Sequence, residues 1–234
     1  MVWYRMEETD EWSEEDVSLN ARRLLELRER LDEWVPARQV TDNLLLATWN
    51  IKEFDGPRPK DAVQYIAEVV SRFDVVAIQE VGADVSGLED LLDCLGSWYD
   101  AYYTDVTRGQ KGNGERMAFV YDSRKVEPTG LIGEVVVPPE EDEEGDQVVP
   151  SDQLARTPMV VGFKSGWFRF HLSLVHILYG EDTKGLDREG EIRTIAQSMR
   201  DHAEDAIERD RNATTILLGD FNIHSPEDDT FEQI

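Results

Sequence analysis

Residues that could bind a metal ion or accept a proton follow several short apolar runs of the sequence. Four such runs, which we expect to be buried strands, each end at or beside a polar residue of this kind. The runs are 44–49, 75–78, 168–175 and 216–219, and the polar residues are Asn50, Glu80, His176, Asp220 and Asn222. Because strand ends meet at one rim of a sheet, these groups could converge. Carboxylate and amide oxygens without a thiolate partner favour a hard ion such as Mg²⁺ or Mn²⁺ over zinc.

Each of these residues also has a purely structural interpretation. Asn50 could form a turn, Glu80 a loop contact, and His176 could be a hydrogen-bonded histidine at a strand end. Asp220 and Asn222 could form an Asx-turn. Four such strand endings in one chain are harder to explain in this way than one, so together they favour a functional site.

The elements that must position these residues are many short strands and few helices. The apolar patterns predict strands at 44–49, 75–78, 116–122, 131–137, 158–164, 168–176 and 214–219, and helices at 13–34, 61–72 and 188–208. This proportion favours two packed sheets with helices outside them. The first helix has a capping pair, Ser13 and Asp16, and ends before Pro36. We therefore divide the chain into an N-terminal helical extension, 1–40, and a domain, 41–234.

Composition limits the classes of function. The 234 residues include 24 Lys and Arg against 50 Asp and Glu, so the net charge is −26, while 40% of residues are apolar. Enough apolar side chains are present for a core, which argues against global disorder. The negative charge argues against broad, charge-driven binding to DNA or RNA. The single cysteine, Cys94, excludes an internal disulfide and a cysteine-based zinc site.

Two segments have unusual polar composition. Six acids stand among the seven residues 140–146, within an insert at 137–148 that we expect to be a solvated loop, with calcium binding or DNA mimicry as the alternatives. The basic, glycine-rich segment 108–114 could face the substrate or form an ordinary surface hairpin. No apolar run approaches the ~18 residues of a membrane span, and the first twelve residues are not a secretory signal. The sequence thus predicts a soluble, cytoplasmic protein without a membrane span.

Five sequence blocks resemble, in their order, those of the endonuclease/exonuclease/phosphatase superfamily, and in particular its pancreatic deoxyribonuclease branch. The blocks are Thr48–Ile51, Ile78–Val81, Glu115–Tyr121, Val175–His176 and Gly219–Asn222. The resemblance extends from Leu44 to Asn222. It implies an α/β fold, namely a four-layer α/β/β/α sandwich of two packed mixed sheets, to which this chain adds the N-terminal helix.

The same resemblance implies the roles of the site residues. Glu80 would be the principal ligand of Mg²⁺ or Mn²⁺, and Asn50 would be a second ligand or would orient the first. A divalent ion at this place would offset the negative charge of a phosphodiester.

The remaining roles concern the proton and the phosphate. His176 would lie near the scissile phosphate and be oriented by Glu115. Asp220 would orient or activate the attacking water, and Asn222 would hold a phosphate oxygen. Arg156 matches a substrate-contacting arginine of the deoxyribonuclease branch. A carboxylate beside an imidazole favours its charged form, and a carboxylate near water can accept a proton.

One departure from the family concerns the C-terminus. Family members end with an aspartate-bearing strand and a Ser-Asp-His motif, whereas none of His171, His202 and His224 lies in such a context. We therefore expect the domain to be C-terminally incomplete and this chain to lack the terminal catalytic pair. Truncation of the sequence, a partner chain that completes the site, and a degenerate enzyme are the three explanations. Uncovered sheet edges favour the first.

The leading functional hypothesis is a metal-dependent phosphodiester hydrolase, most similar to a deoxyribonuclease acting as an endonuclease or exonuclease on DNA. A second hypothesis keeps the site but replaces DNA by a phospholipid or another small phosphate ester, which suits the net charge of −26. A third is a non-catalytic binding module that retains the fold. Activity with a metal ion and loss of metal binding on Glu80→Ala would separate the third hypothesis from the others.

Overall fold

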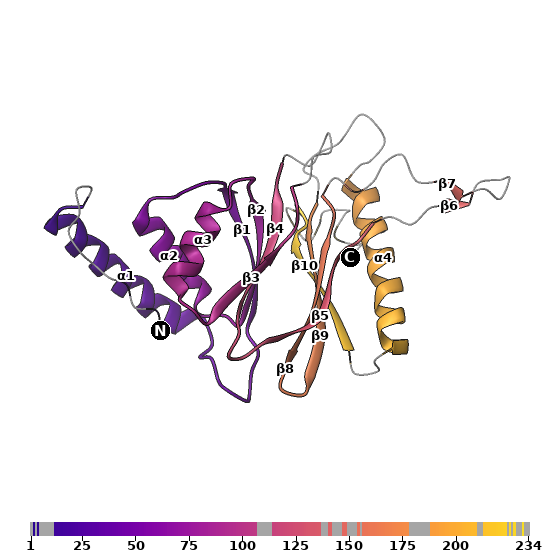
Figure 1. Ribbon diagram of the computed structural model, residues 1–234, viewed down its shortest axis with the longest axis horizontal. Coiled ribbons are helices and arrows are strands. Elements are labelled where there is room, and N and C mark those ends of the chain that lie inside the picture. The colour runs from indigo at the N-terminus through magenta and orange to yellow at the C-terminus, as the bar shows by residue number, and fades with distance from the viewer. Residues whose placement is uncertain are drawn as a thin grey trace.

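Two four-stranded mixed sheets form the centre of the computed structural model (Figure 1). The structure describes residues 2, 4, 12–106, 114–136, 140–141, 147–148, 154, 156–177, 188–209, 213–223, 225, 227 and 231. The first sheet has the order β1 (Leu46–Phe54), β2 (Val75–Val81), β4 (Arg116–Asp122), β3 (Tyr99–Tyr103). The second has the order β10 (Ala213–Asp220), β9 (Phe168–His176), β8 (Met159–Ser165), β5 (Glu127–Glu134). One pair in each sheet is parallel, β1 with β2 and β10 with β9, and the other pairs are antiparallel.

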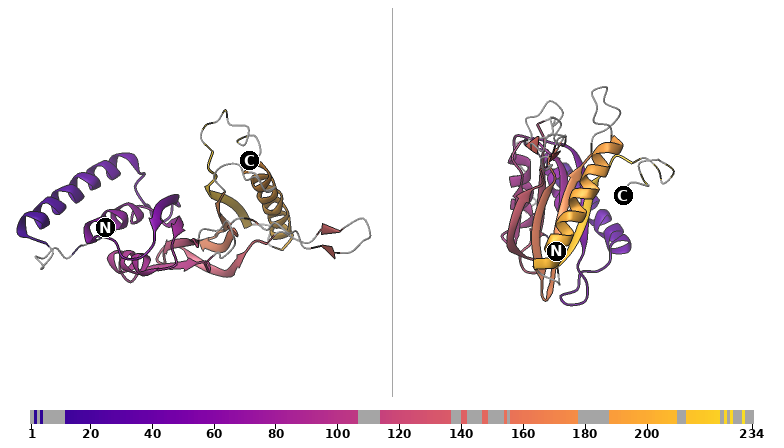
Figure 2. Two further views of the ribbon diagram at one scale, coloured as in Figure 1. Left: turned by 90° about the horizontal axis from the view of Figure 1, so that it is seen from above. Right: turned by 90° about the vertical axis from the view of Figure 1, so that its right-hand side faces the viewer.

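Helices cover the outer faces of both sheets (Figure 1). α2 (Lys60–Val70) and α3 (Ser86–Leu95) lie on the first sheet, and α4 (Arg188–Arg209) lies on the second. α1 (Glu14–Trp34) packs on α2, farther from the sheet (Figure 2). This arrangement confirms the predicted α/β/β/α sandwich with an additional N-terminal helix. No helix in the described part of the chain is long and apolar enough to cross a membrane.

Alternation along the strands divides the apolar side chains between three layers. On β4, Ala118 and Val120 face α2 and α3, whereas Phe119 faces the second sheet. Between the sheets, Phe119 packs against Phe163 and Phe163 against Phe170, with ring centroids 6.0 and 5.9 Å apart. This central layer fixes the distance between the sheets. It therefore also fixes the distance between residues at the carboxyl ends of their parallel strands.

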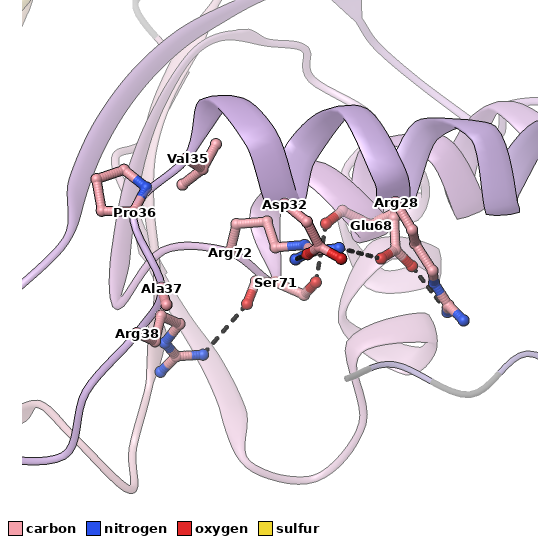
Figure 3. A pocket seen from close by; sticks show the side chains of 9 residues that line it. All are labelled: Arg28, Asp32, Val35, Pro36, Ala37, Arg38, Glu68, Ser71 and Arg72. Carbon is pink, nitrogen blue, oxygen red and sulfur yellow. Dashed lines mark hydrogen bonds and ion pairs between the residues drawn. The ribbon is translucent and has the colours of Figure 1, made fainter.

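The N-terminal helix has the boundaries that its capping pair predicts. The side chain of Ser13 accepts from the backbone of Asp16, whose carboxylate accepts from the backbone of Ser13. Leu24 and Leu31 are buried on one face of the helix. A cavity of about 460 Å³ lies between the end of α1 and the end of α2 (Figure 3). Its lining includes Ser71, which precedes β2, so the cavity is at the opposite end of this strand from Glu80.

The segment after α1 is fastened to the first sheet by a buried ionic cluster, here called the Arg38 junction (Arg38, Asp74, Tyr99 and Asp122). The guanidinium of Arg38 donates to Asp74 Oδ1 at 2.8 Å, to Asp122 Oδ2 at 2.7 Å and to the Tyr99 hydroxyl at 3.0 Å. Both aspartates are 1% exposed. Burial raises the pKa of Asp122, but hydrogen bonds from Arg124 and Arg38 outweigh it and lower the pKa to about 2. Arg38 is therefore the cation that offsets the buried charge of Asp74, and it shares the charge of Asp122 with Arg124.

Three parts of the structure differ from the sequence-based expectation. α3 and β3 were not predicted, because α3 has no side-chain N-cap and β3 is an edge strand of five residues. The strand expected at 131–137 is β5, Glu127–Glu134, whose position follows from its pairing with β8 rather than from its apolar residues. Within the acidic insert, β6 (Glu140–Glu141) pairs with β7 (Gln147–Val148). The rest of the acidic run, and most of the segment 108–114, lie outside the described residues.

Candidate active site

The carboxyl ends of the two parallel strand pairs face each other at one end of the molecule. β1 and β10 lie next to each other across the two sheets. Asn50 pairs in register with Gln79 in the first sheet, and Asp220 pairs with His176 in the second. The packing of the sheets therefore brings together strand ends that are up to 170 residues apart in the chain.

Asn50 joins the two sheets directly. Its Nδ2 donates to Glu80 Oε1 at 2.8 Å and to Asp220 Oδ2 at 3.0 Å. Its Oδ1 is buried and has no hydrogen-bond partner among the described residues. One amide group thus holds two carboxylates from different sheets and retains an oxygen that can accept a further bond or a metal ion.

The backbone at Glu80 is bent so that its carboxylate enters the site. The pairing of β2 with β4 is irregular between Ile78 and Val81, and Glu80 has φ +60°. Left-handed backbone is uncommon for a residue other than glycine. The second carboxylate oxygen, Oε2, accepts from the backbone amide of Glu53 at 2.9 Å. Both oxygens of Glu80 are therefore held by donors from β1.

A histidine, a carboxylate and an arginine form the adjoining half of the site. His176 Nδ1 lies 3.2 Å from Glu115 Oε2, and His176 Nε2 lies 3.9 Å from Glu80 Oε1. Arg156 donates to Glu115 through Nε at 2.7 Å, while its Nη1 is buried and has no hydrogen-bond partner in the described part of the chain. His176 is 5% exposed and Arg156 is 7% exposed.

Charge compensation determines the ionisation of Glu115. Burial by itself would raise the pKa of this carboxyl group, but the neighbouring imidazole of His176, the hydrogen bonds from Arg156 and the positive charge of the guanidinium lower the pKa to about 2. Glu115 is therefore ionised at neutral pH.

The turn after β10 places Asp220 and Asn222. Asp220 Oδ1 accepts from the backbone amide of Asn222 at 2.9 Å, and the Asn222 side chain donates to the carbonyl of Ile177 at 2.6 Å. Asp220 and Asn222 thus form the Asx-turn that was considered as a purely structural role for them. The other oxygen of Asp220, Oδ2, nevertheless accepts from Asn50 in the site. Gly219 has φ +148°, and a Cβ atom there would lie 2.0 Å from the carbonyl oxygen of Val175. Only glycine permits this close approach of β10 to β9.

All the residues proposed from the sequence for the site lie in one continuous series of contacts. The order of contact is Arg156, Glu115, His176, Glu80, Asn50, Asp220, Asn222. Sequence reasoning missed the backbone amide of Glu53, because a main-chain donor has no residue signature. Alternation along the strand places Thr48 on the same side as Asn50, but Thr48 was assigned no role; its hydroxyl accepts from the buried side chain of Gln79 at 2.8 Å.

The donors on Glu80 and Asn50 that we assign to a metal ion are oxygens. Within the described residues, no three or more His, Cys, Asp and Glu side chains are grouped so that they could hold a metal ion. The oxygens that lie together in the site belong to Glu80, to Asp220 and to Asn50, whose Oδ1 has no hydrogen-bond partner among the described residues. Mg²⁺ is commonly bound by one or two carboxylates and keeps several waters, so this donor set fits it better than it fits zinc.

Solved structures share this architecture at low sequence identity. An endonuclease/exonuclease/phosphatase family protein from Bacteroides thetaiotaomicron is 20% identical, with a TM-score of 0.55 over 81% of this chain and 66% of that chain. TDP2 from C. elegans is 16% identical, with a TM-score of 0.52 over 82% of this chain and 49% of that chain. D. rerio TDP2 complexed with a single strand DNA product is 15% identical, with a TM-score of 0.52 over 79% and 62%.

These similarities show the fold alone. The chain spans about half to two thirds of the length of these three structures. No curated protein matches the sequence. The model of the Endonuclease/Exonuclease/phosphatase family, in contrast, matches residues 47–233, a range that contains every residue of the contact series. The chain therefore belongs to the Endonuclease/Exonuclease/phosphatase family.

Proposed function

We propose that the protein is a metal-dependent phosphodiester hydrolase and that it acts as a nuclease on DNA. The observation that carries this proposal is the continuous series of contacts from Arg156 to Asn222 at the rim of the two sheets. It joins a guanidinium, an imidazole, carboxylates and amides, which are the groups that neutralise a phosphodiester and move a proton. Membership of a family named for phosphoesterases supports the same class of reaction.

Glu80 and Asn50 would hold Mg²⁺ or Mn²⁺. The carboxylate of Glu80 is already oriented by donors on both oxygens, and Asn50 retains a buried oxygen without a partner among the described residues. When bound, the ion would offset charge on the phosphate oxygens. Our assignment of the ion to Mg²⁺ or Mn²⁺ rests on the oxygen-only donor set.

The other side chains divide the work on the proton and the phosphate. Asp220 is placed to accept a proton from the attacking water, while Asn50 limits the orientation of its carboxylate. His176, whose Nδ1 lies 3.2 Å from Glu115, would contact the phosphate through Nε2. Arg156 would contribute Nη1, its remaining donor, to a phosphate oxygen, and Asn222 would hold another.

One observation supports DNA as the substrate, and another favours a different substrate. A similar fold, D. rerio TDP2, is known in complex with a single strand DNA product. The net charge of −26, however, opposes long-range attraction of a polyanion and favours a phospholipid headgroup or another small phosphate ester as the alternative substrate. Short single-stranded DNA satisfies both observations, because few of its phosphates need to approach the acidic surface.

The experiment compares a short single-stranded oligonucleotide with a small phosphodiester, in Mg²⁺ or Mn²⁺ and in chelator. We expect metal-dependent cleavage that is lost in Glu80→Gln and retained in Glu127→Gln, a surface variant on β5 whose carboxylate pairs with Lys164. Faster turnover of the small ester would favour the alternative substrate. Cleavage that persists in chelator would contradict the metal dependence. No cleavage of either substrate would contradict the proposal that these residues catalyse hydrolysis without the terminal Ser-Asp-His segment.

We assign the catalytic unit to residues 41–234 and treat residues 1–40 as an N-terminal extension. The family match begins at residue 47, which supports this boundary. α1 packs on α2, buries its own Leu24 and Leu31, and forms an ion pair of 2.9 Å between Arg28 and Glu68 of α2. The extension therefore covers the helical layer at a distance from the site.

A further inference from the structure

One peptide group holds the carboxylate of Glu80 from the side of β1. The amide of Glu53 donates to Glu80 Oε2 at 2.9 Å. The carbonyl of the same peptide group belongs to Lys52, and no cis peptide bond occurs in the described residues. In a trans peptide the N–H and the C=O point in opposite directions. The oxygen of Lys52 therefore points away from Glu80.

Arg58 binds this peptide group on its other side. Its Nη2 donates to the carbonyl of Lys52 at 2.7 Å and to the carbonyl of Glu53 at 2.5 Å. The guanidinium also lies 5.5 Å from the centroid of the Phe54 ring, which is 1% exposed. The Lys52–Glu53 peptide group therefore lies between the guanidinium of Arg58 and the carboxylate of Glu80. The guanidinium is stacked on the buried ring of Phe54.

This arrangement has two physical consequences. A cation on the peptide oxygen polarises the peptide group and strengthens its N–H as a donor to Glu80. In addition, the two hydrogen bonds of Arg58 restrain Glu53, whose φ of +51° is unfavourable for a residue with a Cβ atom. Without Arg58, rotation of the Lys52–Glu53 peptide toward the ordinary extended conformation would turn the amide away from Glu80.

We propose that Arg58 is a positioning residue that acts on Glu80 through the Lys52–Glu53 peptide group. It keeps one oxygen of Glu80 in place while Asn50 keeps the other. The consequence for metal affinity rests on the proposed function, whereas the consequence for the Glu53 amide does not.

The loop around this peptide group has other attachments that preserve the fold when Arg58 is removed. The amide of Gly82 donates to the carbonyl of Phe54 at 2.8 Å, and the amide of Asp84 donates to Asp55 Oδ1 at 2.8 Å. These bonds join the end of β1 to the end of β2 independently of Arg58. Replacement of Arg58 should therefore alter the peptide orientation locally and leave the thermal midpoint nearly unchanged.

The test uses the whole chain and three variants. Arg58→Ala removes the donor, Arg58→Lys retains a cation that can reach the same carbonyls, and Arg30→Ala is the matched control. Arg30 is an exposed arginine on α1 that lies 5.9 Å from the ring of Trp34, so its loss also removes a guanidinium stacked on an aromatic ring. Hydrogen exchange of the Glu53 amide is measured by NMR without metal, and Mn²⁺ affinity by calorimetry.

We expect Arg58→Ala to accelerate exchange of the Glu53 amide at least about tenfold and to weaken Mn²⁺ binding about tenfold, the low end of the effects of partners that orient metal ligands. Arg58→Lys keeps the charge but loses the planar group stacked on Phe54, so both effects should lie between those of the unmodified protein and Arg58→Ala. Arg30→Ala should match the unmodified protein. Unchanged Glu53 exchange in Arg58→Ala would overturn the proposal. If the unmodified protein binds no Mn²⁺, the proposed function fails, while the exchange measurement still decides the role of Arg58.

Discussion

The Glu115 carboxylate contributes a pH-dependent stabilisation to the site, and Glu115→Gln tests it. In the folded chain this carboxylate lies 3.2 Å from His176 Nδ1 and accepts from Arg156 Nε at 2.7 Å. Glutamine keeps the shape and a neutral oxygen but removes the charge. The substitution leaves the buried guanidinium of Arg156 without its anionic partner, which is the unfavourable arrangement for a buried charge.

The size of the effect follows from the acidity of Glu115. Burial raises the pKa, but the neighbouring imidazole of His176 and the hydrogen bonds from Arg156 lower it from 4.5 to about 2. At about 1.4 kcal/mol for each tenfold change in acidity, this difference corresponds to about 3 kcal/mol, and partial exposure of the carboxylate to solvent reduces our expectation to about 2 kcal/mol. Because the pKa is lower in the folded state, the stabilisation is present in full above the unfolded pKa and is lost as the pH falls through 2.

Urea unfolding of the unmodified protein and of Glu115→Gln at pH 7 and near pH 3 measures this contribution. We expect the free energies of unfolding to differ by about 2 kcal/mol at pH 7 and by less than about 1 kcal/mol near pH 3. Glu127→Gln is the matched control, because Glu127 pairs with Lys164 on the surface and should contribute less than about 1 kcal/mol at either pH. An equal difference at both pH values would refute the assignment of the stabilisation to the charge of Glu115.

Three further substitutions test the packing that supports the site. Arg38→Ala should lower the free energy of unfolding by about 3 kcal/mol in urea, because buried Asp74 would lose its cation while Asp122 would keep Arg124; a loss below about 1 kcal/mol would contradict this. Gly82→Ala should destabilise by about 1–3 kcal/mol, since the new Cβ would lie 2.0 Å from the Oδ1 of Asp55. Gly133→Ala, where a Cβ would meet nothing within 4 Å, should stay within about 0.5 kcal/mol, and equal effects of the two glycine changes would refute the steric argument. Leu91→Ala, at a fully buried position of α3, should cost about 2–5 kcal/mol, and an unchanged thermal midpoint would show that α3 is not part of the core.

Local patterns in the sequence predicted most of the framework. The apolar run before Asn50 became β1, and the capping pair at Ser13 marked the start of α1. These elements are predictable because periodicity and capping are properties of neighbouring residues. α3 and β3 escaped prediction because α3 lacks a side-chain N-cap and β3 is a short edge strand paired only with β4.

The sequence by itself determined which residue types stand at the strand ends, and their order resembles that of a known family. Only the tertiary structure decided that Asn50 reaches both Glu80 and Asp220, since these contacts depend on how closely the two sheets pack. The orientation of the Lys52–Glu53 peptide group was likewise decided only by the tertiary structure. Its orientation between Arg58 and Glu80 depends on a left-handed residue and a main-chain donor, and neither has a signature in the side-chain sequence.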